Sequence, residues 1–179
     1  GPKGVGALYV RARPPVRLAA RLNGGGQERG LRAGTLNVPG IVGFGVAAEL
    51  AAGEIASESR RLSVLRDHLL ARLRESLSGV TVNGSLEHRL PHNLNVAFAG
   101  IEAAALLAAL DNVAASAGSA CSSDHPESSH VLRALGLGEA RALSSVRFGL
   151  GHANTREDID DAADRIVATV RRLRGLTAP

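Results

Sequence analysis

Apolar and polar residues repeat with two different periods along this chain. Between residues 39 and 78, apolar side chains recur every three or four positions, as they do on a helix with one buried face. The clearest part of this repeat is Leu62, Leu65, Leu69 and Leu73. Residues 93–98 instead alternate apolar and polar positions, which is typical of a half-buried strand. The pattern therefore predicts a long helix and at least one strand.

Shorter apolar runs between turn-forming residues complete the expected order of elements. We expect further strands at residues 5–10, 80–82, 113–116 and 144–150, and further helices at residues 101–110, 129–135 and from 155 onward. Thr155, with Asp158 three residues later, has the spacing of a capping box at the start of the last helix. From residue 39 on, helices and strands mix in a way that predicts an α/β fold, a small sheet covered by helices.

Composition narrows the class of protein. Apolar residues make up 45% of the 179 residues and aromatic residues only 2%, so the core must consist of aliphatic side chains. Without an apolar run near about 18 residues, we expect no membrane span. One cysteine excludes an internal disulfide and fits a reducing compartment, so we expect a cytoplasmic protein. The net charge is +4, but the arginines alternate with acids and aromatic platforms are scarce, so we expect no direct nucleic-acid binding.

The only cysteine, Cys121, lies among small and turn-forming residues from 116 to 126. This setting predicts an exposed thiol on a flexible loop, which is either a reactive group or an incidental surface thiol. His125 and His130 follow it. One thiol with loosely spaced imidazoles is a poor ligand set, so we expect no metal site.

Two other segments carry candidate binding groups. Residues 24–35 are rich in glycine and contain Arg29, Arg32 and Thr35, a composition that suits a phosphate site but also a plain flexible loop. Arg147 stands inside an otherwise small and apolar strand, so its charge requires a partner. That partner is either an acidic residue of the chain or a substrate carboxylate held by two hydrogen bonds.

Five motifs occur in one order along the chain: GPKG at residues 1–4, GGGQERGLRAGT at 24–35, GSACS at 118–122, VLRALG at 131–136 and SSVRF at 144–148. Together they resemble the cysteine desulfurases, pyridoxal-phosphate enzymes of the class-V aminotransferase type. The resemblance is to the branch whose catalytic cysteine lies on a long flexible loop, and it covers essentially the whole chain.

The resemblance implies a fold type I enzyme of which this chain is the C-terminal portion. Residues 1–38 would be the end of the large cofactor-binding domain with a loop that crosses to the dimer partner. Residues 39–179 would be a linking helix and the small α/β domain, with the cysteine loop at about 117–129. The lysine that holds the cofactor would lie upstream of Gly1, and Lys3 does not match it.

The resemblance also implies roles for single residues. Cys121 matches the nucleophile that takes sulfur from cysteine, and Arg147 matches the arginine that binds the substrate carboxylate. Thr35 matches a threonine that reaches the cofactor phosphate of the other subunit, and Arg32 lies in the same crossing loop. The sequence departs from the family at Ala117, where a serine is usual; we expect this small change to be tolerated.

The implied reaction converts L-cysteine to L-alanine and leaves a persulfide on the enzyme, which a homodimer would pass to an acceptor. Iron–sulfur scaffolds and enzymes that thiolate RNA or DNA are the implied acceptors. Two alternatives stay open: a selenocysteine lyase or aminotransferase of the same fold, and a non-catalytic truncated interaction module. Because the lysine is absent from this sequence, we expect these residues alone to be inactive.

Overall fold

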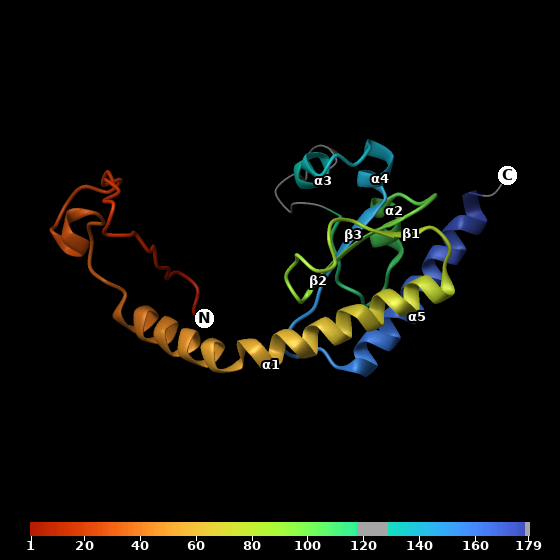
Figure 1. Ribbon diagram of the computed structural model, residues 1–179, viewed down its shortest axis with the longest axis horizontal. Coiled ribbons are helices and arrows are strands. Elements are labelled where there is room, and N and C mark those ends of the chain that lie inside the picture. The colour runs from red at the N-terminus through yellow and green to blue at the C-terminus, as the bar shows by residue number, and fades with distance from the viewer. Residues whose placement is uncertain (118–128, 178–179) are drawn as a thin grey trace. The chain divides into compact units, whose positions relative to one another are not determined.

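The computed structural model describes residues 1–117 and 129–177 (Figure 1). The chain divides into two compact units, Gly1–Ile55 and Ala56–Pro179. The long helix α1 (Val38–Ser76) begins in the first unit and ends in the second, which confirms the helix predicted from residue 39. The two units differ in how far they bury their apolar side chains.

The first unit leaves most of its apolar residues exposed. Gly40 is the one buried residue between 1 and 55, and the relative exposures of Leu8 and Tyr9 are 77% and 88%. Outside α1 the unit contains a short 3₁₀ helix, Gln27–Gly30. The strand expected at residues 5–10 is wrong: this segment has no regular structure. A strand requires a neighbour for its backbone N–H and C=O groups, and no described residue supplies one.

The second unit contains a three-stranded antiparallel sheet in the order β1-β2-β3. The strands are β1 (Val80–Val82), β2 (Asn93–Phe98) and β3 (Ser145–Gly149), close to the predicted ranges. The strand expected at residues 113–116 is wrong, because pairing there is limited to one bridge between Ser116 and Arg147. The Ser116 N–H donates to the Arg147 carbonyl at 3.1 Å, and the Arg147 N–H donates to the Ser116 carbonyl at 2.7 Å.

One face of this sheet forms the core of the second unit. Alternate residues of β2 and β3, such as Leu94, Val96 and Phe148, are buried together with the predicted leucine stripe of α1. Helices α2 (Ala103–Ala109) and α5 (Arg156–Thr177) add to the same core, and α1 and α5 lie on one side of the sheet in Figure 1. The alternation of apolar and polar residues in β2 therefore marks its buried face, as the sequence predicted.

The opposite face of the sheet carries polar residues. Two short helices, α3 (His130–Ala134) and α4 (Glu139–Leu143), lie on this side (Figure 1). Helix α3 was expected, whereas α4 was not. This polar face is where the candidate site lies.

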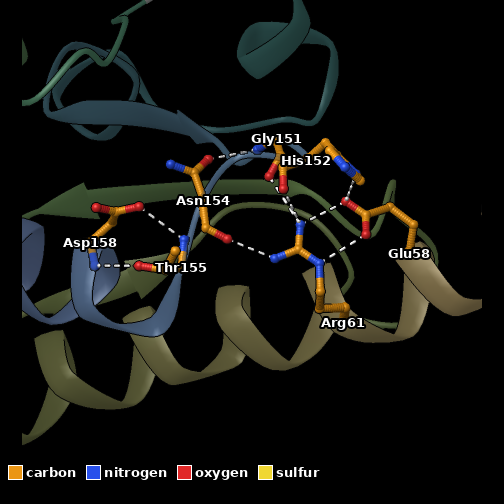
Figure 2. A network of polar contacts seen from close by, with 7 residues as sticks. All are labelled: Glu58, Arg61, Gly151, His152, Asn154, Thr155 and Asp158. Atoms are coloured by element: carbon orange, nitrogen blue, oxygen red, sulfur yellow. Dashed lines mark hydrogen bonds and ion pairs between the residues drawn. The ribbon is translucent and has the colours of Figure 1, made fainter.

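The capping box at the start of α5 is confirmed. The Thr155 N–H donates to Asp158 Oδ2 at 2.9 Å, and the Asp158 N–H donates to Thr155 Oγ1 at 3.2 Å (Figure 2). These two bonds satisfy donors that the first turn of a helix otherwise leaves unpaired. Acidic residues in the first turn also complement the helix dipole.

Within the described residues, α1 is long and apolar enough to cross a membrane by length and composition alone. Most of that apolar stretch is exposed here. A helix that packs against another protein surface can have the same length and composition. Length and composition therefore do not distinguish a membrane from a protein interface as the environment of α1.

Candidate functional site

Arg147 lies on the polar face of the sheet, between two neighbouring backbone segments. On one side it pairs with Asn95 of β2, and on the other side it forms the bridge with Ser116. Residues paired across antiparallel strands extend their side chains on the same face. Asn95, Arg147 and Ser116 therefore form a row of polar side chains.

The Arg147 guanidinium has no partner among the described residues, neither a hydrogen-bond acceptor nor an acidic side chain. The residue is exposed. An internal salt bridge, one of the two explanations for an arginine at this position, is therefore not found in the described part of the chain. The other explanation, a guanidinium left free to hold an anion, agrees with this geometry.

A cavity of about 360 Å³ lies beside Arg147. The described residues that line it include two arginines and two histidines but no aspartate or glutamate. Its second arginine, Arg89, is occupied: it donates to the carbonyl oxygens of Ser85, Asn83 and Asn93 at 2.5, 2.6 and 3.4 Å. Burial, together with the nearby charge of Arg66, lowers the pKa of Arg89. Arg147 therefore remains as the available cation in a cavity suited to an anion.

The same cavity is lined by the residues that flank the Cys121 segment. Ala117 lies just before it and Ser129 just after it, and both contribute to the wall. Cys121 and His125 themselves lie outside the described residues. Both ends of the segment that carries Cys121 therefore lie at the cavity.

The glycine-rich loop belongs to the first unit. Gly34 has a φ of 105°, a conformation that favours glycine. Its N–H donates to Gln27 Oε1 at 3.2 Å. Arg32 Nη1 donates to the carbonyl oxygens of Gly34 and Thr35 at 3.0 and 3.3 Å, so this side chain partly stabilises its own loop. Thr35 is exposed. The role of both residues at a cofactor phosphate stays a prediction.

Sequence reasoning missed Asn95 and Ser116, although one signal was present. The alternation in residues 93–98 places Asn95 opposite the buried Leu94 and Val96, on the face that carries Arg147. His130 also lines the cavity, but no group of three or more possible metal ligands occurs among the residues that the structure describes.

The chain matches the family Aminotransferase class-V over residues 1–161. It is 56% identical over 177 residues to the cysteine desulfurase IscS of Anaeromyxobacter sp. (strain Fw109-5), which covers 99% of this chain and 44% of that protein. It is 51% identical to the mitochondrial cysteine desulfurase of Arabidopsis thaliana, with 99% of this chain and 39% of that protein covered.

Solved structures give the same result. A NifS-like protein superposes with a TM-score of 0.81 at 34% identity, covering 96% of this chain and 44% of that chain. This chain therefore belongs to the class-V aminotransferase family, and it is similar to the cysteine desulfurases within it. It spans about 44% of the length of the bacterial relative.

Proposed function

We propose that this chain is the C-terminal portion of a pyridoxal-phosphate-dependent cysteine desulfurase, which converts L-cysteine to L-alanine and an enzyme-bound persulfide. The observation that carries the proposal is the cavity at Arg147. It is lined by both flanks of the Cys121 segment and by the Arg147 guanidinium, which has no partner among the described residues, and no acidic residue is among its described lining. The names of the relatives support the same reaction.

In this proposal Arg147 holds the substrate and Cys121 reacts with it. A guanidinium that holds a carboxylate by two hydrogen bonds fixes the orientation of the bonds at the α-carbon. The Cys121 thiolate then attacks the sulfur of the substrate, because a thiolate is the nucleophilic form of cysteine. A sulfur–sulfur bond forms while the Cβ–sulfur bond breaks, and the electron pair of the broken bond stays with the carbon skeleton. Protonation of that skeleton gives alanine.

Pyridoxal phosphate, when bound, would supply the electron withdrawal that weakens the bond from carbon to sulfur. The donors of the glycine-rich loop fit its phosphate by their chemistry: an exposed Thr35 hydroxyl and the guanidinium of Arg32. We assign Thr35 and Arg32 to the phosphate of the partner subunit.

The exposed apolar residues of the first unit support a larger assembly. Leu8, Tyr9 and Leu50 have relative exposures of 77%, 88% and 60%, and large apolar side chains exposed in such number favour an interface. We assign residues 1–38 to the large domain and its crossing loop, and residues 39–179 to the linking helix and small domain of a homodimer. Such an interface also accounts for the exposed apolar half of α1 without a membrane.

The persulfide would be delivered to a protein acceptor, either an iron–sulfur scaffold or an enzyme that thiolates RNA or DNA. The chain itself would bind no nucleic acid. Since a single cysteine fits a reducing compartment, we assign the protein to the cytoplasm or, as the name of the plant relative indicates for that protein, to an equivalent organelle.

Intact mass spectrometry of the full-length protein tests the function. After incubation with L-cysteine, we expect a mass increase of one sulfur atom, located on the peptide with Cys121 and reversed by a thiol reductant. The Cys121→Ser variant is the control, and it should release no alanine. Alanine release at the wild-type rate by that variant would rule out the proposed nucleophile, and it would favour a lyase or aminotransferase instead.

A further inference from the structure

Three polar side chains follow one another across the sheet, on the face that carries the candidate site. Asn83 comes directly after β1, and its N–H donates to the Asn95 carbonyl at 2.9 Å. Asn95 in turn pairs with Arg147. All three residues line the same cavity. The orientation of the two carboxamides decides which atoms this cavity presents to a ligand.

Arg141 of α4 fixes the orientation of Asn83. Its Nε lies 2.8 Å from Asn83 Oδ1, and a guanidinium can only donate, so the oxygen of Asn83 must be on that side. The Asn83 Nδ2 then donates to Asn95 Oδ1 and to Ser145 Oγ, each at 2.7 Å. Ser145 uses its own proton on the Arg141 carbonyl at 2.6 Å, so its hydroxyl is free to accept. The network has only one consistent set of donors and acceptors.

This network also fixes Asn95. Because Oδ1 accepts from Asn83, the two N–H groups of Asn95 Nδ2 are left over, and no described residue accepts from them. The buried side-chain atoms without partners in the described residues are Asn93 Oδ1 and Ser116 Oγ. Asn95 Nδ2 is therefore open to the cavity rather than sealed inside the protein.

The cavity thus presents two neighbouring donor groups, the amide nitrogen of Asn95 and the guanidinium of Arg147. Two donors cannot form a hydrogen bond with each other, whereas one acceptor placed between them could accept a hydrogen bond from both. A carboxylate has two oxygens and about four lone-pair positions, so it can accept two bonds from a guanidinium and a further bond from an amide.

We propose that Asn95 is a second carboxylate-binding residue, whose Nδ2 donates to the same substrate carboxylate that Arg147 holds; this rests on the proposed function. Arg147 is a long, exposed cation. Asn95 adds a second, neutral hydrogen-bond donor whose direction is fixed. Arg141 and Asn83 act through Asn95 as positioning residues, since they prevent its carboxamide from turning its oxygen toward the carboxylate.

Calorimetric titration of the cofactor-loaded, full-length protein tests this role. A Cys121→Ser background prevents sulfur transfer. The two ligands are L-cysteine and cysteamine, which lacks only the carboxylate. Asn95→Asp replaces the donor by an oxygen without changing the shape, so we expect L-cysteine to bind about a hundredfold more weakly and cysteamine to bind as before. Asn95→Ser should weaken L-cysteine binding about tenfold.

The matched control is Asn154→Asp, because Asn154 Oδ1 accepts from the Gly151 N–H at 2.7 Å and an aspartate can keep that bond. It should change neither titration. Asn95→Ser decides the test if Asn95→Asp does not fold. Equal losses for both ligands, or no loss for either, in the Asn95 variants would overturn the role of Asn95.

The Arg147→Ala variant distinguishes a failure of the Asn95 role from a failure of the proposed function on which it rests. If Arg147→Ala weakens L-cysteine alone while both Asn95 variants bind it normally, the role of Asn95 is wrong and the proposed function stands. If Arg147→Ala binds L-cysteine as tightly as the parent, the carboxylate site itself is wrong, and the role of Asn95 is overturned with it.

Discussion

Arg61 on α1 donates a hydrogen bond of 2.6 Å from Nη1 to the carbonyl oxygen of Asn154, 93 residues farther along the chain (Figure 2). Its Nη2 also reaches the carbonyl oxygens of Gly151 and His152 at 3.2 and 3.0 Å. Glu58 accepts from the same guanidinium at 2.8 and 2.7 Å, and this hydrogen bonding holds the pKa of Glu58 below its usual value. The turn that Arg61 binds follows β3, so this guanidinium fastens the strand of Arg147 to α1.

Replacing Arg61 by leucine should therefore destabilise the second unit. Three main-chain carbonyls would lose the hydrogen bond from Arg61, and Glu58 would lose its arginine partner. Arg165→Leu is the matched control, because the ion pair of Arg165 found in the described part of the chain is with Asp161 on its own helix, and such exposed pairs contribute little. We expect a clearly lower Tm for Arg61→Leu than for Arg165→Leu. Equal Tm values for the two variants would contradict the role of Arg61 as a clamp.

The leucine stripe of α1 gives a prediction for core packing. Leu73 has a relative exposure of 0%, and Leu73→Ala should lower the free energy of unfolding by about 2–5 kcal/mol, because it leaves a cavity in the core. Val64, on the same helix, has a relative exposure of 63%, and Val64→Ala should change that free energy by no more than about 0.5 kcal/mol. Denaturant titration of both variants measures the difference. Similar losses would show that the stripe is not the buried face.

An ion-pair cluster between α1 and α5 predicts a pH dependence of stability. His68 Nε2 lies 2.7 Å from Asp160 Oδ1, and Arg72 also donates to Asp160. The hydrogen bond from His68 is the main cause that lowers the pKa of Asp160 from its ordinary 3.8. A lowered folded-state pKa means that the stabilisation is present above pH 3.8 and is lost as the pH falls through the folded-state pKa.

Asp160→Asn should therefore lower Tm at pH 7, and its difference from the wild type should shrink as the pH is lowered below about 4. Asp161→Asn is the neighbouring control, since the ion pair of Asp161 with Arg165 lies within α5. Thermal unfolding followed by circular dichroism at several pH values gives both differences. A Tm difference for Asp160→Asn that stays constant from pH 7 to pH 3 would contradict the prediction.

Substitution of Arg147 should affect substrate binding far more than cofactor binding. In the full-length protein, Arg147→Ala should raise KM for L-cysteine by about 10- to 100-fold, the loss expected when a charged hydrogen-bond donor is removed. Arg147→Lys should recover part of this loss, because it keeps the charge but not the two-point geometry. Steady-state kinetics with a parallel cofactor titration provide the measurement. An unchanged KM would leave Arg147 with a structural role.

Local patterns in the sequence were read correctly where residues a few positions apart decide the structure. The repeat of Leu62, Leu65, Leu69 and Leu73, the alternation around Val96 and the pair Thr155 and Asp158 all depend on such short-range geometry. The strand at residues 5–10 was wrong because a strand is completed only by a partner from elsewhere. Helix α4 was missed, although α3, which has the same length, was predicted.

The amino-acid sequence by itself determined the family and identified Cys121 and Arg147 as the groups with suitable chemistry, because these depend on residue identity and motif order. Only the tertiary structure decided that Arg147 has no described partner and that Asn95 turns its amide nitrogen to the same cavity. The physical reason is distance along the chain: the orientation of that amide is set through Asn83 by Arg141, 58 positions from Asn83, and no local pattern encodes a hydrogen bond that the fold itself creates.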